Sequence, residues 1–289
     1  MSPLIISSLL ILMALTHHTD SLPVLVQKNS TYTPRDSNET FLSKEDFEAA
    51  RHLSRPQLQK VSKTDLSLGN MTEGDIAIED IEQFVLESNQ LERNAIRARW
   101  MRWPNGVIPY TISTEYDSQE RAMLAKAFSD YHQKTCIRFV PRDPSIHQDF
   151  ISIFPGGGCY SYVGRRFGRQ HISLHSGCFI YGTVLHELMH AVGFFHEQSR
   201  ADRDLYVRIQ WSSIRSEYAY NFNKYSLNEI EHLGDYDYGS VMHYGPTAFG
   251  KQGQQTIWPY LPFVTIGQRI GFSDGDVKKL NKLYNCRNY

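Results

Sequence analysis

The pattern of apolar and polar residues along positions 94–289 predicts a domain that mixes helices and strands. Residues 118–134 place apolar side chains three and four positions apart, with Ser118 placed to cap the first turn, and this spacing predicts a helix. Short runs rich in β-branched and aromatic residues predict strands at 107–112, 137–140 and 150–154. No segment recurs with a period of roughly 20 to 50 residues, which argues against a repeat protein. We therefore expect an α+β domain.

The first 93 residues contain fewer core-forming side chains than the rest, with 4 of the 36 aromatic residues and none of the 4 cysteines. Residues 22–70 are polar with a weak helical period at 44–53, and residues 75–93 are amphipathic. The first 93 residues carry 8 basic and 14 acidic side chains, and the remaining residues carry 22 and 17. We expect a loose acidic leader followed by a packed domain that begins after Arg93.

The composition of the whole chain narrows its class. Lys plus Arg (30) nearly equal Asp plus Glu (31), and the formal net charge of −1 gives no reason to expect nucleic acid or an anionic membrane surface as a partner. The hydrophobic content of 41% excludes wholesale disorder.

The chain opens with an apolar run at residues 4–15 that is too short to span a bilayer and typical of a signal-peptide core. No Lys or Arg precedes it and no clean cleavage site follows, so an N-terminal membrane anchor is the alternative. We assign residues 1–21 to a signal peptide and expect a secreted, extracellular protein with no membrane span. Three glycosylation sequons agree with export, at Asn29, Asn38 and Asn70.

The cysteines predict two disulfides, because all four lie in the part that we expect to be exported and packed. Four cysteines allow three pairings. Cys159 and Cys178 bracket a short glycine-containing segment, whereas Cys136 and Cys286 are far apart, so we favour Cys159 with Cys178 and Cys136 with Cys286. Ligation of a metal by thiolates is the competing interpretation, but there is no Cys-x-x-Cys pair to support it.

The most informative stretch runs from His186 to His196. On a helix, His186 and His190 share a face and can present two imidazole nitrogens to one metal ion. Glu187 lies beside that face, where it can reach a water molecule but not the metal. Gly193 can end the helix in a left-handed conformation, which turns the chain back and delivers His196 as third ligand. Three neutral nitrogens leave zinc an open position, which marks a catalytic site.

The alternative interpretation of this stretch is a helix whose histidines only pack or form hydrogen bonds. From average composition, a bare His-Glu-x-x-His arises by chance in about 1 in 100 chains of this length, and the added glycine and histidine reduce that to roughly 1 in 100,000. The extended motif therefore predicts a site for one zinc ion per chain.

Positions 94–289 resemble the catalytic domain of the astacin family of metzincin zinc endopeptidases. The resemblance rests on residues 186–197, on Ser240-Val241-Met242-His243-Tyr244, on the cysteine spacing, and on Arg93-Asn94-Ala95 before Trp103-Pro104. It implies a twisted mixed sheet with helices in the N-terminal half, a mostly irregular C-terminal half with a final helix, and an active-site cleft between them. The chain stops soon after Cys286, and we expect a minimal form with signal peptide, propeptide (residues 22–93) and catalytic domain (residues 94–289) only.

The resemblance also implies roles for single residues. Met242 would form the turn beneath the zinc, and Tyr244 would stabilise the oxyanion. Asp75 would take the water position in a latent precursor, although Met71-Thr72 stand where an aromatic residue usually precedes Glu73-Gly74-Asp75. The alternative is that Asp75 caps a following helix. The segment Cys159-Tyr160-Ser161 would bind extended substrate along its edge, or would be a purely structural strand.

Activation would follow from cleavage between Arg93 and Asn94 by a protease of trypsin-like specificity, and the new amino terminus would pair with Glu197. We expect a secreted zinc endopeptidase, made as a latent zymogen, that hydrolyses internal peptide bonds of proteins with Glu187 as general base for a zinc-activated water. The rivals are a catalytically silent binding module on the metzincin fold and a zinc hydrolase of a non-peptide substrate. The presence of Glu187 and of all three histidines disfavours the silent module.

Overall fold

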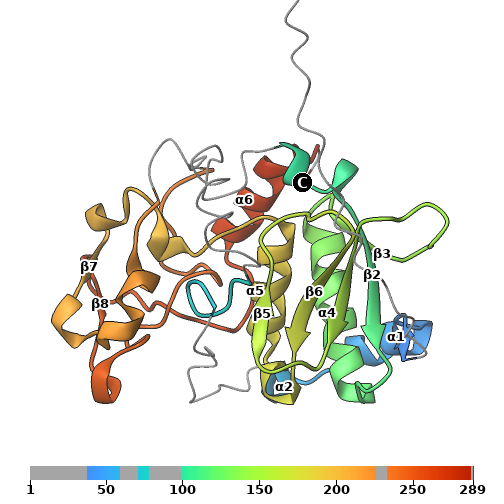
Figure 1. Cartoon of the computed structure of the whole chain (residues 1–289), viewed down its shortest axis with the longest axis horizontal. Coiled ribbons are helices and arrows are strands. Elements are labelled where there is room, and N and C mark those ends of the chain that lie inside the picture. Colours follow the sequence, from blue (N-terminus) through green and yellow to red (C-terminus); the bar gives the residue numbers. More distant parts are fainter. Residues whose placement is uncertain (1–37, 59–70, 78–98, 226–232, 288) are drawn as a thin grey trace, which may run out of the picture. The chain divides into compact units, whose positions relative to one another are not determined.

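The computed structural model describes residues 38–58, 71–77, 99–225, 233–287 and 289 (Figure 1). All of these belong to one unit of the chain, residues 36–289. The predicted signal peptide, the sequons at Asn29 and Asn70, and the bond between Arg93 and Asn94 lie outside the described residues.

A six-stranded mixed sheet organises the N-terminal half of the fold. Its strands are β1 (Glu39–Thr40), β2 (Val107–Ser113), β3 (Arg138–Pro141), β4 (Phe150–Phe154), β5 (Cys159–Ser161) and β6 (Arg169–Leu174). The order is β1-β2-β4-β6-β5, with β3 also paired to β2. β2 pairs in parallel with β3 and β4, as β4 does with β6, whereas β1 and β5 are antiparallel to their neighbours. The three strands predicted from the sequence are confirmed as β2, β3 and β4.

The helices are α1 (Lys44–Arg51), α2 (Arg55–Leu58), α4 (Ser118–Lys134), α5 (Tyr181–Val192) and α6 (Asp274–Leu283). α4 has the predicted range, but the prediction that Ser118 caps it is wrong. The Asp117 side chain accepts the N–H groups of Gln119 and Glu120, and the Glu120 carboxylate accepts the N–H of Asp117 in return. This reciprocal capping box satisfies three backbone donors, so the helix begins with Asp117 as its cap and Ser118 inside it.

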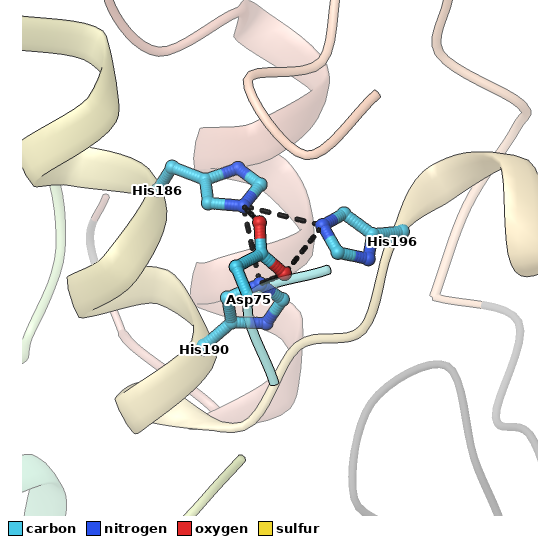
Figure 2. A group of neighbouring side chains, drawn as sticks. All are labelled: Asp75, His186, His190 and His196. Atoms are coloured by element: carbon cyan, nitrogen blue, oxygen red, sulfur yellow. Dashed lines mark hydrogen bonds and ion pairs between the residues drawn. The ribbon is translucent and has the colours of Figure 1, made fainter. Parts of the chain in front are cut away.

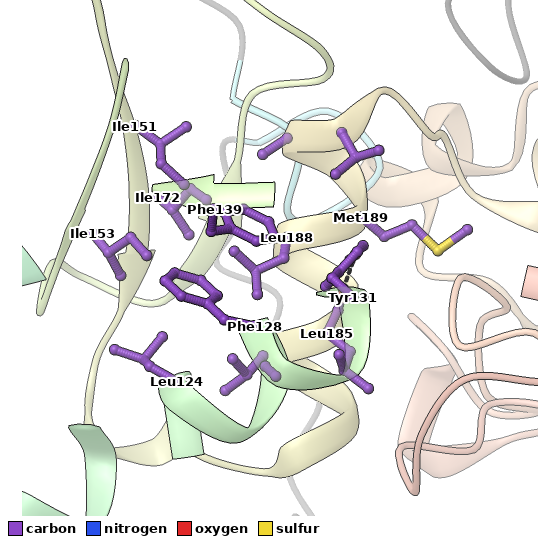
Figure 3. Close-up of a cluster of buried hydrophobic side chains, with 14 of the residues drawn as sticks. Leu124, Phe128, Tyr131, Phe139, Ile151, Ile153, Ile172, Leu185, Leu188 and Met189 are labelled. Atoms are coloured by element: carbon purple, nitrogen blue, oxygen red, sulfur yellow. Dashed lines mark hydrogen bonds between the residues drawn. The ribbon is translucent and has the colours of Figure 1, made fainter. Parts of the chain in front are cut away.

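α4 and α5 pack against the sheet and enclose the main hydrophobic core (Figure 3). Phe128 of α4 stacks on Phe139 of β3 with ring centroids 4.3 Å apart, and Ile153 of β4 and Leu188 of α5 belong to the same buried cluster. Every residue of α5 is buried. Each large apolar side chain that becomes buried contributes about 1.5–3 kcal/mol, so the core fixes α5 firmly in place.

The C-terminal half is mostly irregular, which confirms the expected fold class. It has a second buried cluster and a two-stranded sheet of β7 (Val207–Ile209) and β8 (Ile257–Pro259), and α6 follows it. Short 3₁₀ turns complete the described elements of both halves: Arg99–Met101, Pro104–Gly106, Ser176–Cys178, Glu197–Ser199, Arg203–Leu205, Trp211–Ser213, Ser216–Phe222 and Lys251–Gly253.

Two disulfides join distant parts of this fold, and they are the two pairs favoured from the sequence. Cys136, just after α4, is bonded to Cys286, just after α6, and Cys159 of β5 is bonded to Cys178, just before α5. None of the helices in the described ranges combines the length and apolar character that crossing a membrane requires.

Candidate active site

The three motif histidines converge at the C-terminal part of α5 (Figure 2). His186 and His190 lie one turn apart on the helix, and their Nε2 atoms are 3.1 Å apart. Gly193 follows the helix with a φ of 126°, a backbone conformation that residues other than glycine rarely adopt. The chain then turns back and places Nε2 of His196 3.2 Å from Nε2 of His186. All three imidazoles are buried.

A hydrogen-bond acceptor holds the outer nitrogen of each ring. Nδ1 of His186 donates to the carbonyl of Val241 (2.8 Å), and Nδ1 of His190 donates to the carbonyl of Phe194 (2.7 Å). Nδ1 of the third ring donates to the Glu73 carboxylate (2.6 Å). Because these partners accept, a proton is assigned to each Nδ1, and each Nε2 faces inward, where its lone pair is available to a metal ion.

This donor set fits a single zinc ion. Lone pairs that face one another in a buried space repel unless a cation lies among them. Tetrahedral zinc at about 2.0–2.1 Å from each nitrogen would hold its ligand atoms about 3.3 Å apart, close to the observed 3.1 and 3.2 Å. Burial alone would lower the pKa of His196, but the Asp75 and Glu73 carboxylates raise it to about 9. The two carboxylates therefore favour a positive charge at His196.

The carboxylate of Asp75 lies against the inward-facing nitrogens of the three histidines (Figure 2). Its Oδ2 is 3.1 Å from Nε2 of His186, and its Oδ1 is 3.4 Å from Nε2 of His190 and 3.3 Å from Nε2 of His196. Burial alone would raise the pKa of Asp75, but the charge of His196 and the contacts with the three histidine rings hold it well below its usual range. The group is therefore ionised, as a metal ligand must be.

A tight turn at residues 71–77 carries this aspartate into the site. Glu73 and Gly74 both have positive φ, 51° and 85°, and Thr72 pairs with Ile76 across the turn. Residues 71–77 contain no helix. The alternative role of the aspartate as a helix cap is therefore not realised within these residues, and the rest of the predicted amphipathic segment lies outside the described ranges.

The same turn adds itself to the edge of β5. Ser161 donates its N–H to the carbonyl of Asp75 (3.0 Å) and accepts the N–H of Ala77 (2.9 Å), in a parallel bridge. β5 consists of Cys159, Tyr160 and Ser161, the residues predicted to bind substrate. The leader segment therefore occupies the backbone groups that an extended peptide would need at this edge.

Glu73 is a site contact that the sequence did not reveal. It is buried, its carboxylate accepts hydrogen bonds from His196 and from the Tyr225 hydroxyl, and its carbonyl accepts the Tyr244 hydroxyl. Tyr225 lies 152 residues further along the chain. No spacing pattern could have linked these residues before the fold was known. The Tyr244 ring lies 4.7 Å from the His196 ring, so the predicted oxyanion residue is beside the site.

Glu187 lies beside the histidine face with 1% of its surface exposed. Burial, and next the negative charge of Asp75, raise the pKa of Glu187 well above its usual range. In the described part of the chain no donor reaches its Oε2 atom. A carboxyl group held in this way is protonated while the ionised Asp75 lies beside it.

A buried aspartate on α6 holds the turn beneath the histidines. Asp276 accepts the Ser240 hydroxyl (2.6 Å) and the Val241 N–H (2.9 Å), and burial raises its pKa to about 6. The Val241 carbonyl is the acceptor that orients His186. Met242 follows in this turn and is buried. Sequence reasoning identified Met242 but missed Asp276, whose only local signal is the capping box of α6.

Glu197, the predicted partner of the new amino terminus, already has cationic partners. Its Oε1 accepts Lys279 Nζ (2.6 Å) and Arg200 Nη1 (3.2 Å), and the N–H of Asp237 (2.9 Å). The side chains of Lys279 and Glu197 are 4% and 3% exposed. A terminus at Asn94 would therefore join a carboxylate that is already paired.

Three further predicted residues have clear positions. Asn38 is exposed, as glycosylation requires. Cys159 and Cys178 lie within metal-ligand distance of His175, but both sulfurs are in the disulfide and offer no thiolate to a metal.

Comparisons with known proteins agree with this geometry. The family model for Astacin, a peptidase family, matches residues 95–285. The chain is 49% identical over 268 residues to zinc metalloproteinase nas-4 of Caenorhabditis elegans, covering 91% of this chain and 85% of that protein. It is 55% identical over 197 residues to zinc metalloproteinase nas-13 of the same species, covering 68% of this chain and 44% of that protein.

A solved structure is also similar: high choriolytic enzyme 1 of the medaka Oryzias latipes, a hatching enzyme zinc-protease. It matches with a TM-score of 0.60 and 48% identity, covering 64% of this chain and 94% of that chain.

The buried ion pair at Glu197 predicts a large loss of stability when its lysine is removed. Lys279→Met should lower the free energy of unfolding by about 3 kcal/mol, because it leaves a buried carboxylate with one cationic partner fewer. Urea unfolding of the full chain, followed by tryptophan fluorescence, measures the change. The matched control is Lys278→Met, an exposed position on the same helix, which should change the value by less than about 0.5 kcal/mol. Equal effects of the two substitutions would contradict a stabilising role for Lys279.

Proposed function

The chain belongs to the astacin family and is a zinc metalloendopeptidase, and we propose that it is secreted as a latent zymogen and uses Glu187 as its general base. In this proposal residues 1–21 are the signal peptide, residues 22–93 the propeptide and residues 94–289 the catalytic domain. Its substrates are proteins or peptides. The observation that carries the proposal is the Asp75 carboxylate beside three converging Nε2 atoms. A tethered anionic ligand in the fourth position of a His₃ site supports latency.

The chain's own residues supply most of the proposed mechanism. Zinc held by His186, His190 and His196 would act as a Lewis acid that polarises the scissile carbonyl and acidifies a water molecule. When Asp75 withdraws, one of the two causes that raise the Glu187 pKa disappears, so the carboxyl group can ionise. Glu187 then takes a proton from the attacking water and delivers it to the leaving amine.

Tyr244 and β5 position the substrate in this proposal. The Tyr244 hydroxyl donates to the Glu73 carbonyl in the latent form, which supports the idea that the same hydroxyl donates to the oxyanion once the propeptide has left. Ser161 offers one N–H and one C=O at the edge of β5, and both bond the propeptide. An extended substrate would use these groups in its place.

Latency depends on the covalent tether in this proposal. A carboxylate on the metal excludes the attacking water, and linkage to the same chain gives it a high effective concentration. Cleavage between Arg93 and Asn94 by a protease of trypsin-like specificity would break this link, so that the propeptide can then dissociate. The new terminus would then approach Glu197, whose existing pairing with Lys279 supports a site that is largely preformed.

The first prediction concerns the general base. Glu187→Gln should retain zinc, because the ligands are unchanged, and should lose at least about 100-fold in the rate of casein cleavage after activation. Zinc content is measured by atomic absorption, and wild type with a chelator gives the metal-free baseline. His190→Ala is the matched control and should lose both zinc and activity. Casein cleavage by Glu187→Gln within a few-fold of wild type would exclude the assigned role.

The second prediction concerns latency. Asp75→Ala in a chain that also carries Arg93→Gln, to prevent cleavage, should cleave casein measurably, because water can then reach the metal. The single variant Arg93→Gln should remain inactive. If the uncut Asp75→Ala protein is no more active than Arg93→Gln alone, Asp75 does not block the site.

The third prediction concerns activation. Trypsin-type cleavage should produce an active form whose amino-terminal sequence, read by Edman degradation, begins at Asn94. An active form that starts at Arg97 or later would rule out this cleavage site, and Arg93→Gln should slow its production.

A further inference from the structure

Residues 38–58 of the leader make a second set of contacts with the catalytic domain, and we call these residues the anchor. The anchor contains β1, α1 and α2. Its strand β1 lies at the opposite edge of the sheet from β5, where the turn at residues 71–77 pairs, because the strand order is β1-β2-β4-β6-β5. α1 is drawn on the side of β2 in Figure 1, at the right. Four strand intervals of about 4.8 Å separate β1 and β5 by about 19 Å. The anchor therefore contacts the domain independently of the histidine site.

Backbone pairing joins the anchor to an otherwise open part of the β2 edge. β3 pairs with β2 only as far as Tyr110 on this side. β1 continues beyond it, with Thr40 opposite Ile112 and Glu39 opposite Ser113, and Thr114 donates to the carbonyl of Asn38 (2.8 Å). The leader thus completes the sheet of the catalytic domain as an added strand.

Apolar side chains of the anchor enter the main core. Leu42 and Ala50 are 8% and 4% exposed and belong to the same buried cluster as α4, and the N–H of Leu42 bonds the Tyr110 hydroxyl (3.3 Å). Phe47 and Leu53 pack against that cluster. Burial of this kind is the main favourable term in association and does not depend on a metal.

Two acidic side chains of the anchor are matched to two arginines of the catalytic domain. Arg121 of α4 donates from Nε and Nη2 to the two oxygens of Asp46 (3.1 and 2.6 Å), and its Nη2 also reaches the carbonyl of Phe41 (2.7 Å). Arg169 of β6 donates to Glu39 (2.7 Å). The side chains of the Arg121–Asp46 pair are 18% and 11% exposed, so solvent screens it weakly. A bidentate pair of this kind gives both strength and register.

From these contacts we propose that the anchor keeps the propeptide on the catalytic domain after the chain is cut at Arg93, so that the cut propeptide remains a bound inhibitor. This inference rests on the proposed zymogen. The propeptide then binds at two points, with residues 59–70 as the covalent link between them. Release of either point leaves the other bound, and the released point rebinds at a high effective concentration. Cleavage alone therefore does not start activity at once. The rate at which the anchor dissociates then determines how fast activity appears.

The test measures retention of the propeptide without relying on protease activity. Full-length chains carry Glu187→Gln, to prevent self-digestion, and a site-specific viral protease sequence in place of residues 90–93. After cutting, gel filtration and mass spectrometry report whether the propeptide co-elutes with the catalytic domain. Asp75→Ala removes the carboxylate contact at the histidines. The Glu73 contacts and the backbone pairing with Ser161 remain the same in every chain compared, so that differences in retention among the chains report the anchor.

Three chains in the Asp75→Ala background are compared. The unmodified background should retain the propeptide, whereas Arg121→Gln with Arg169→Gln should release it at least about 10-fold faster. The matched control is Arg208→Gln with Lys251→Gln, which removes the same charge from exposed positions in the C-terminal half and should retain it. Release from the unmodified background as fast as from the double-arginine variant would overturn the proposal.

A second pair of changes guards against misfolding of the catalytic domain. Glu39→Gln with Asp46→Asn alters only the propeptide and should accelerate release in the same way, while the exposed change Glu48→Gln should not. Retention in the Glu39→Gln and Asp46→Asn chain equal to that of the background would also overturn the proposal. With Glu187 restored, the wild-type chain should show a lag in casein cleavage after cutting, shortened about 10-fold by the anchor variants. If the cut wild-type chain never cleaves casein, the proposed function is refuted, but the measured retention of the propeptide still tests the role of the anchor.

Discussion

Three imidazole nitrogens that point their lone pairs at one another inside the protein are favourable only with a cation among them. The architecture on both sides of α5 serves to hold this arrangement. On one side the core built on Phe128 and Leu188 fixes the helix against the sheet. On the other side the Val241 carbonyl fixes the His186 ring, and Asp276 of α6 fixes the turn that contains Val241. The C-terminal half therefore needs little regular secondary structure, because its hydrogen bonds to α5 and α6 place it.

The leader segment contacts both edges of the six-stranded sheet. At β5 it bonds the backbone groups of Ser161, and at the histidines it places the Asp75 carboxylate against the ring nitrogens. At the far edge β1 covers an open part of β2 that would otherwise be an unpaired strand edge. In the two-point proposal neither contact has to be strong by itself, because the covalent link of residues 59–70 keeps a released point close to the surface that it left. The latent state then depends on both ends of one sheet.

Much of the fold and the metal ligands could be predicted because their signals are local. The spacing from His186 to His190 places two ligands on one helix face, and Gly193 explains how His196 joins them. The period of apolar residues in 118–134 predicted α4 over its full length, since burial of one helical face imposes that period. The cap of α4 could not be predicted correctly by inspection of the first helical residue, because Asp117 satisfies more backbone donors than a serine hydroxyl does.

The contacts that complete the site depend on how segments far apart in the chain meet. Glu73 reaches Tyr225 across 152 positions, and Lys279 reaches Glu197 across 82. No periodicity connects such pairs, because their approach is set by packing of the sheet, α5 and α6. The order of residues thus predicted the three histidines that fit a zinc ion, which one helix and one turn bring together. The fold determined which groups orient the histidine rings and neutralise the buried charges. A buried charge or ring nitrogen needs a partner, and packing decides which group comes within hydrogen-bond distance of it.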